Sequence, residues 1–314
     1  MLLRRLFRVA PVTLLSYGVL LSASACDRKA PASHSDSAVA PRESASVSAM
    51  AGTNVSGWVP SAGPALFVQG ETRDEAIVLL PTDSESAAAS RLDLLGTEGA
   101  EITLFGRGGT RLAARLGVPR QPADAECRVW TLREVHGEGA DNTWAVGFVG
   151  DQTAPLALDS IDALSSRDSL ALAAEASRLA SAVTVMTAPS FQGLRFTAHD
   201  IRRFEVSPGV QAIVAHLIRK VNQEANPQEE QTLLIAERDS GVTSGPYRLV
   251  YAERTHGLEE TTPTPEVIAG VRIVGRPMLV VARDSDEGVA YALLERTGPR
   301  QWKIRWTSGL TRCG

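Results

Sequence analysis

Two closely spaced aspartates give this sequence its first opportunity for chemistry. Asp284 and Asp286 flank Ser285 and are followed by Glu287 and Gly288. Carboxylates that alternate on a tight turn can point at one hard cation such as Ca²⁺, but Gly288 stands where a third acidic ligand is needed. Asp and Gly are also the usual residues of hairpin turns. We therefore interpret the segment as a turn and predict no metal site, with Asp284 and Asp286 as the ligands to test first.

A glycine-rich stretch offers a second candidate site. Residues 105–109 read Phe-Gly-Arg-Gly-Gly, after an expected strand and before 111–116, which we interpret as a possible helix. Glycine-rich turns between a strand and a helix can hold phosphate. The dinucleotide fingerprint, however, needs glycine where Arg111 stands, and no Gly-Lys-Ser/Thr follows. The stretch therefore predicts a tight turn, and no cofactor is expected.

The histidines and cysteines are residue types that can act in catalysis, but their spacing matches no catalytic or metal-binding motif. Four histidines follow residue 58, namely His136, His199, His216 and His256. None is paired at zinc-ligand spacing, and no Gly-x-Ser-x-Gly is present for a serine nucleophile. In an exported protein, Cys127 and Cys313 are expected to form a disulfide rather than to act as nucleophiles. A non-catalytic role is therefore favoured over an enzyme.

The N-terminus indicates where the chain goes. Residues 1–8 contain three arginines and no acid, residues 9–21 are uncharged, and Ala23-Ser24-Ala25-Cys26 follows. A basic segment, a short apolar run and small residues before a cleavage point are typical of a secretory signal peptide. The apolar run is shorter than the ~20 residues of a membrane-spanning helix.

The end of this signal resembles the lipobox of bacterial lipoproteins, in which small residues precede a cysteine. The family usually has leucine where this chain has Ala23. The resemblance implies removal of 1–25, a lipid on Cys26, and an extracytoplasmic protein anchored to the membrane on its periplasmic face. Because Ala23-Ser24-Ala25 also suits ordinary signal peptidase, simple secretion is the alternative.

The next segment, 26–57, is expected to be a disordered tether. Its residues 27–57 contain no Leu, Ile, Phe, Tyr or Trp. A segment without large apolar groups cannot offset the entropy lost on ordering. A flexible spacer between the lipid and a folded body is the role that fits.

The folded body is expected from residue 58 onward, where all five tryptophans of the 314-residue chain lie. Short apolar runs separated by Gly, Pro, Asp or Ser predict strands near 66–68, 76–80, 102–105, 128–132 and 144–149. A helical repeat of apolar residues predicts one helix over 165–185, opened by Ser165 or Ser166. Three acids, Asp159, Asp162 and Asp168, crowd its start, where capping explains them without a site.

The C-terminal third carries the β pattern. Residues 210–221 fit a helical stripe, but most of their apolar residues are β-branched, which suits a strand. We favour a strand because the segments on both sides are interpreted as hairpins. Trp302, Ile304 and Trp306 alternate with polar residues, which predicts a strand with one buried face. Tyr247, Leu249 and Tyr251 alternate in the same way.

An internal echo adds two related hairpins. Residues 233–240 resemble 279–285, and Glu253-Arg254-Thr255 resembles Glu295-Arg296-Thr297. The fold class expected is α+β, mostly antiparallel β, with a C-terminal meander and one central helix. The body divides into 58–187 and 188–314, or forms one sheet-rich domain.

Together these features predict a non-catalytic cell-envelope lipoprotein that acts as an interaction or structural module. The expected partners are the membrane, through the N-terminal lipid, and an unidentified envelope protein. A formal charge of −4 gives no basic footprint for nucleic acid. A module that binds a small molecule or a cation is the alternative, and a hydrolase is the third possibility.

Overall fold

The structure is a computed structural model that describes residues 66–79, 99–120, 129–138, 143–149, 153–183, 188–221, 226–239 and 245–312. The expected signal peptide and tether and the three cysteines, Cys26, Cys127 and Cys313, lie outside these residues. The described chain is mostly antiparallel β-sheet with one α-helix, which confirms the expected fold class. None of its helices combines the length and hydrophobicity needed to cross a membrane.

The first six strands form a closed barrel in the order β1-β2-β5-β4-β3-β6. Their bounds are β1 (Leu66–Gln69), β2 (Glu75–Leu79), β3 (Glu101–Phe105), β4 (Arg111–Arg120), β5 (Val129–Glu138) and β6 (Val146–Val149). Phe67 and Trp130 pack edge to face in its interior. The expected helix at 111–116 is wrong, because Leu112, Ala114 and Leu116 point inward while the residues between them stay exposed, which is the two-residue period of a strand.

Two five-stranded antiparallel sheets follow, which we call the outer sheet and the central sheet. The outer sheet has the order β12-β11-β10-β9-β8, from strands β8 (Asp159–Ser160), β9 (Thr197–Ser207), β10 (Val210–Val221), β11 (Gln228–Asp239) and β12 (Arg248–Leu258). The central sheet has the order β16-β15-β14-β13-β7, from strands β7 (Thr153–Pro155), β13 (Thr264–Ile273), β14 (Arg276–Ser285), β15 (Gly288–Gly298) and β16 (Gln301–Thr307). Residues 210–221 are therefore a strand, as favoured.

The echoed segments form corresponding hairpins in the two sheets. The first copy makes β11 and β12, and the second makes β14 and β15. Strands β7 and β8, from the first half of the body, complete the edges of both sheets through pairing with β13 and β9. The two halves thus share hydrogen-bonded sheets.

Helix α2 (Ser166–Ala182) covers one face of the outer sheet. It begins as expected, because the Ser165 side chain accepts a hydrogen bond from the Asp168 backbone and donates one to the Asp168 carboxylate. Short 3₁₀ turns, η1 (Ile161–Ala163) and η2 (Pro189–Phe191), precede and follow the helix. Asp162 is bonded to Ser160 in the same manner, so both acids act in local capping.

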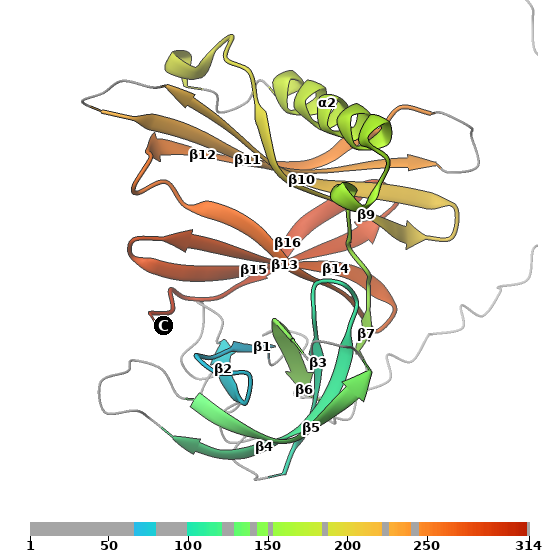
Figure 1. The fold of residues 1–314 in the computed structure, drawn as a ribbon, viewed down its shortest axis with the longest axis vertical. Coiled ribbons are helices and arrows are strands. Elements are labelled where there is room, and N and C mark those ends of the chain that lie inside the picture. Colours follow the sequence, from blue (N-terminus) through green and yellow to red (C-terminus); the bar gives the residue numbers. More distant parts are fainter. Residues whose placement is uncertain are drawn as a thin grey trace, which may run out of the picture. The chain divides into compact units, whose positions relative to one another are not determined.

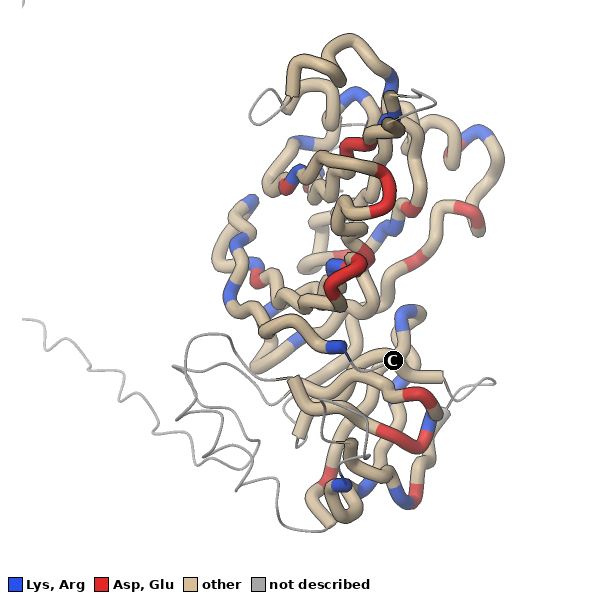
Figure 2. Tube along the Cα trace, turned by 90° about the vertical axis from the view of Figure 1, so that its left-hand side faces the viewer, with Lys and Arg blue, Asp and Glu red and all other residues tan. Residues whose placement is uncertain are grey.

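Figure 1 shows the helix, the two sheets and the barrel as successive layers, and four apolar clusters hold them together. One lies between α2 and the outer sheet, a second between the two sheets, a third between the central sheet and the barrel, and a fourth inside the barrel. Since apolar clusters lie on both sides of the central sheet, both of its faces are buried. Basic and acidic residues are interspersed along the described chain (Figure 2).

The central sheet departs from the alternation expected at β16. Trp302 packs between the two sheets, whereas Trp306 packs toward the barrel, and Ile304 is 44% exposed. The pairing with β15 skips Arg305, which is therefore an extra residue in a β-bulge. The expectation that Trp302, Ile304 and Trp306 share one buried face is wrong, because the bulge turns Trp306 to the opposite face.

The alternation expected at Tyr247, Leu249 and Tyr251 is interrupted in the same way. Tyr247 is buried but Leu249 is 37% exposed. The pairing of β12 with β11 skips Val250, so the strand carries a bulge between Leu249 and Tyr251.

Candidate functional site

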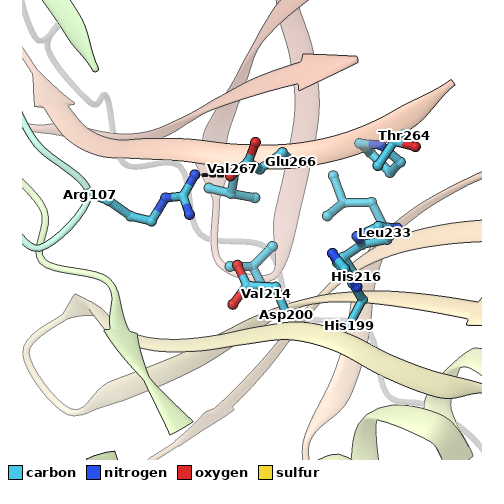
Figure 3. Close-up of a pocket in the computed structure, with 10 residues that line it drawn as sticks. Arg107, His199, Asp200, Val214, His216, Leu233, Thr264, Glu266 and Val267 are labelled. Atoms are coloured by element: carbon cyan, nitrogen blue, oxygen red, sulfur yellow. Dashed lines mark hydrogen bonds and ion pairs between the residues drawn. The ribbon is translucent and has the colours of Figure 1, made fainter. Parts of the chain in front are cut away.

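A cleft of about 330 Å³ lies between the outer and central sheets, beside the apolar cluster that fills the rest of the space between them (Figure 3). It is lined from the outer sheet, from β13 of the central sheet and from the turn between β3 and β4. The lining residues are Arg107, His199, Asp200, Val214, His216, Leu233, Thr264, Pro265, Glu266 and Val267. Its size is at the lower end of the range of small-molecule sites.

The position of the cleft follows from the pattern of side chains on the inner face of the outer sheet. Along β10 and β11, Val214 and Ile235 belong to the apolar cluster between the sheets. Further along the same face the residues become polar, with His216 on β10 and Gln231 and Glu229 on β11. Apolar packing therefore stops, and a cavity with polar walls begins.

A β-bulge turns two neighbouring residues into this cavity. His216 of β10 pairs with Asp200 of β9, and the next pair is Leu217 with Ala198, so His199 is an extra residue. In a regular strand, neighbouring side chains point to opposite faces, whereas a bulge brings two of them to the same side. Both His199 and Asp200 consequently line the cleft.

A chain of hydrogen bonds fixes the protonation of His216. The Nε2 amide group of Gln231 donates to Glu229 and, at 3.1 Å, to the hydroxyl of Thr264. The amide oxygen of Gln231 is left to accept from Nε2 of His216. Nε2 therefore carries the hydrogen, and Nδ1 keeps a lone pair for another donor.

Burial keeps this imidazole neutral. His216 is 4% exposed, and desolvation lowers its pKa below the ordinary value. The ring of His199 lies edge-on to it, with 5.0 Å between the centroids, and its positive form would oppose a second charge. Asp200 and Glu229 act in the other direction, but burial is the largest cause.

Each carboxylate around the cleft has a cationic partner. Asp200 is 2.9 Å from Arg202, and Glu266 is paired with Arg107 of the barrel turn. Glu229 lies 3.3 Å from Lys220, whose pKa is raised, mainly by its hydrogen bond to Glu259. The cleft thus combines neutral and paired charged groups rather than a concentration of one sign.

The turn that carries Arg107 is rich in glycine for a structural reason. The tight turn expected from the sequence is present, but it closes the hairpin of β3 and β4 instead of joining a strand to a helix. Gly109 has a φ of +85°, a conformation that favours glycine, and a Cβ there would lie 3.1 Å from the Cβ of Ala157. The glycines allow a close turn that places Arg107 at the cleft.

A second polar cluster lies on the opposite face of the outer sheet. Glu230 accepts a hydrogen bond from Nε of Arg219 at 2.8 Å and is 3.2 Å from Nε of Arg254. Arg254 also donates to the carbonyls of Ala180 and Val183 at the end of α2, each at 2.9 Å. Both guanidinium groups lie over the Phe196 ring, and burial lowers the pKa of Arg254. This cluster attaches the helix to the sheet.

The residues singled out from the sequence lie elsewhere. Asp284 is the penultimate residue of β14, and Asp286 lies in the β14–β15 turn. The last residue of β14, Ser285, donates to the Gly288 carbonyl across this turn. Neither aspartate lines the cleft. Within the described ranges, no group of three or more His, Cys, Asp or Glu is arranged to hold a metal ion. The sequence shows the cleft histidines, His199 and His216, but it does not predict that they lie side by side.

No protein-family model, curated protein or solved structure matches this chain. Its function is therefore argued from the cleft and from the N-terminal signal.

Proposed function

We propose that this chain is a lipid-anchored extracytoplasmic protein whose folded body binds a small polar molecule and does not catalyse a reaction. The lipid on Cys26 and the tether 26–57 would hold the body at the periplasmic face of the membrane. The proposal keeps the expected envelope lipoprotein and replaces a protein partner with a small ligand. No nucleic acid is involved.

The observation that carries the binding role is the bulge at His199. It brings His199 and Asp200 together on the wall of a cavity that already contains a neutral histidine of fixed tautomer. A cavity with a few convergent polar groups is the usual form of a small-molecule site. Bulges next to such sites commonly serve to direct a side chain.

The composition of the cleft favours binding over catalysis. Among the lining residues that the structure describes, none is Ser or Cys, and the oxygen of Thr264 already accepts a hydrogen bond from Gln231. The two lining carboxylates are engaged by arginines. A hydrolase would need an activated nucleophile or water beside a base, and His216 is the one base that the cleft offers in a defined state.

The exposed apolar residues also favour a small ligand over a protein partner. In the described chain, those with large side chains are spread over β4, α2, β12, β16 and several turns. They are Val118, Leu170, Leu194, Leu249, Leu258, Val274, Ile304 and Leu310. A protein-docking surface would be expected to gather such residues in one patch.

The binding role is tested with a mixed library of sugars, organic acids, amines and amino acids. Ligand-observed NMR on the full-length chain in detergent should find compounds that compete for one site. Replacing His199 with Trp should fill the cleft and abolish binding, because this exposed side chain lines it. Arg195→Trp, exposed on the same segment but outside the lining, is the matched control. If no compound binds, or if His199→Trp binds as the control does, the proposed function is wrong.

The anchor is tested by mass spectrometry of the mature N-terminus. A diacylglyceryl group on Cys26, with residues 1–25 removed, is the expected result. Cys26→Ser should release the chain from the membrane fraction. An unmodified N-terminal Cys26 in a host that processes other lipoproteins would contradict this part of the proposal.

A further inference from the structure

We infer that the ligand of the cleft is a free α-amino acid, held by its ammonium and carboxylate groups at the Arg107–Glu266 pair. This inference rests on the proposed binding function and names the class of ligand. Its starting point is that two opposite charges, carried by different elements, meet at the cleft (Figure 3).

The Arg107–Glu266 pair can exchange partners at little cost. Its side chains are 33% and 52% exposed, and Arg107 stands on a turn while Glu266 stands on β13. Ion pairs exposed to this extent contribute little to the stability of a folded protein. A ligand that offers an equivalent pair of charges can therefore replace the contact without a large loss.

An α-amino acid offers that pair at the required separation. Its ammonium and carboxylate groups are bonded to one carbon, so they lie about as close together as the charges of an ion pair. The carboxylate would accept hydrogen bonds from the planar guanidinium of Arg107, and the ammonium would donate to Glu266. A ligand with a single charge would satisfy one of these side chains and leave the other without its partner.

The rest of the cleft suits the side chain of the amino acid. In Figure 3, Arg107 lies at one end and Thr264 with the two histidines at the other, with Val214, Leu233 and Val267 among them. An aliphatic stem would pack on these apolar residues. At the far end, Nδ1 of His216 can accept a hydrogen bond, so a side chain with a polar N–H or O–H tip is favoured. The cavity of about 330 Å³ suits one amino acid rather than a peptide.

Calorimetry on the full-length chain in detergent tests the inference with the twenty L-amino acids and their blocked forms. We expect at least one free amino acid to bind, and its N-acetyl and carboxamide derivatives to bind at least tenfold more weakly. Glu266→Gln should remove the discrimination against the N-acetyl form. Arg107→Gln should remove the discrimination against the carboxamide. Arg73→Gln, at an exposed arginine paired with Asp74 outside the cleft, is the control and should change neither.

The outcomes separate the ligand class from the binding function. If other compounds of the library bind in a manner blocked by His199→Trp but no amino acid does, the ligand class is wrong and the binding function stands. Equal binding of free and blocked amino acids, or discrimination that survives both substitutions, also overturns the inference. A short peptide that binds more tightly than every single amino acid would assign the cleft to chain termini instead.

Discussion

At the scale of single residues, a neutral buried histidine links the stability of the body to pH. The pKa of His216 is lowered by burial, so the folded state binds its proton less readily than the unfolded chain does. Stability from this group is present above the unfolded pKa, about 6.5, and is lost as the pH falls through the folded value. The hydrogen bond to Gln231 and, after it, the carboxylates of Asp200 and Glu229 raise the pKa and reduce this effect without reversing it.

We therefore predict that the free energy of unfolding decreases as the pH is lowered from about 7.5 to 5.5. One group of this kind contributes at most about 1.4 kcal/mol per pH unit. His216→Gln should flatten the curve, because glutamine can still donate to Gln231 but does not titrate in this range. Urea titrations at a series of pH values measure the slope. His136→Gln, at an exposed histidine of β5, is the control that should keep the wild-type slope; identical slopes in all three proteins would contradict the prediction.

At the scale of elements, bulges in the two sheets decide which side chains reach the cleft and the cores. The pairings skip one residue at several such places, among them Val206 and His199 in β9, Val250 in β12, Ile268 in β13 and Arg305 in β16. A one-residue shift moves every following side chain to the other face of a strand. The bulge at His199 forms part of the candidate site, and the bulge at Arg305 sends the two tryptophans of β16 to different cores.

The sequence predicts the elements better than it predicts these registers. Ser165 with Asp168 marks the start of α2, and the β-branched residues of 210–221 indicate β10, because both signals are local. Counting back from the turn at Pro208-Gly209 would have paired His216 with Ile201, which faces α2. The bulge at Val206 makes Asp200 the actual partner. The position of a bulge depends on packing from both sides of a sheet, which the local sequence does not reveal. For this reason the sequence shows the histidines but does not predict the cleft.

Deletion of His199 should remove the site and spare the fold. The pairs on either side of the bulge, Asp200 with His216 and Ala198 with Leu217, are already in place, so deletion leaves a regular strand of the same register. We expect a melting temperature within about 3 °C of wild type, because about 1 kcal/mol corresponds to 2–4 °C in a body of this size. Ligand-observed NMR should show no binding to the cleft. A melting temperature more than about 10 °C lower would mean that the bulge is needed for folding.

The attachment of α2 depends on one arginine of β12. Arg254 bridges Glu230 of β11 and two carbonyls at the end of the helix, and its side chain is 1% exposed. Such cations near a helix C-terminus are favoured by the helix dipole. Arg296 is the residue of the central sheet that matches Arg254 in the internal repeat, and it connects the two sheets by pairing with Glu237 of the outer sheet. The two matching arginines therefore stabilise different interfaces of the body.

Arg254→Met should destabilise the protein by about 3–5 kcal/mol, the usual cost of removing one partner from a buried ion pair. Methionine fills part of the space, but the Ala180 and Val183 carbonyls lose the Arg254 guanidinium as a donor, and Ala180 keeps the bond from the Val183 backbone. Chemical denaturation measures the loss. The control is Arg178→Met, which breaks the exposed pair with Glu175 on α2 and should leave stability unchanged. Equal stability of both variants would show that the helix is held by apolar packing alone.

At the scale of the whole molecule, ion pairs connect the outer and central sheets, which an apolar cluster also holds together. Arg283 of the central sheet pairs with Glu253 of the outer sheet at 2.7 Å, and Glu237 receives both Arg296 and the Trp302 indole. These contacts connect the two echoed hairpins across the sandwich. The described layers contain their own cores, so the body should be stable without the N-terminal segment.

We predict that deletion of 27–57 leaves the stability of the body unchanged. This segment contains no Leu, Ile, Phe, Tyr or Trp for a core contact. Thermal melts of chains beginning at residues 27 and 58 should agree within about 2 °C, a difference that corresponds to less than about 1 kcal/mol. Deletion of β7 (Thr153–Pro155), which pairs with β13, is the comparison expected to cause a large loss. A drop of more than 4 °C for the shorter chain would show that the tether packs on the body.

The last prediction is a disulfide between Cys127 and Cys313, both of which lie outside the described residues. If Cys26 carries the lipid, these are the two cysteines that remain, in a compartment where disulfides persist. The bond would tie the segment before β5, which begins at Val129, to the end of the chain. The last described residues there are Thr311, which bridges to Val289, and Arg312, which donates to the Glu287 carbonyl. Val129 also belongs to the same apolar cluster as Trp306 of the last strand. Closing so long a loop stabilises by up to about 5 kcal/mol in the chain-entropy model.

Thiol labelling of the denatured, unreduced Cys26→Ser chain should find no reactive cysteine, and labelling after reduction should find two. Replacing both Cys127 and Cys313 with Ser should lower the melting temperature by several degrees, because the unfolded chain regains its freedom while the folded contacts are kept. Reduction of the parent chain should give the same decrease, and reduction of the double variant should give none. Two labelled thiols before reduction would refute the pairing, because denaturation exposes every cysteine that is not bonded.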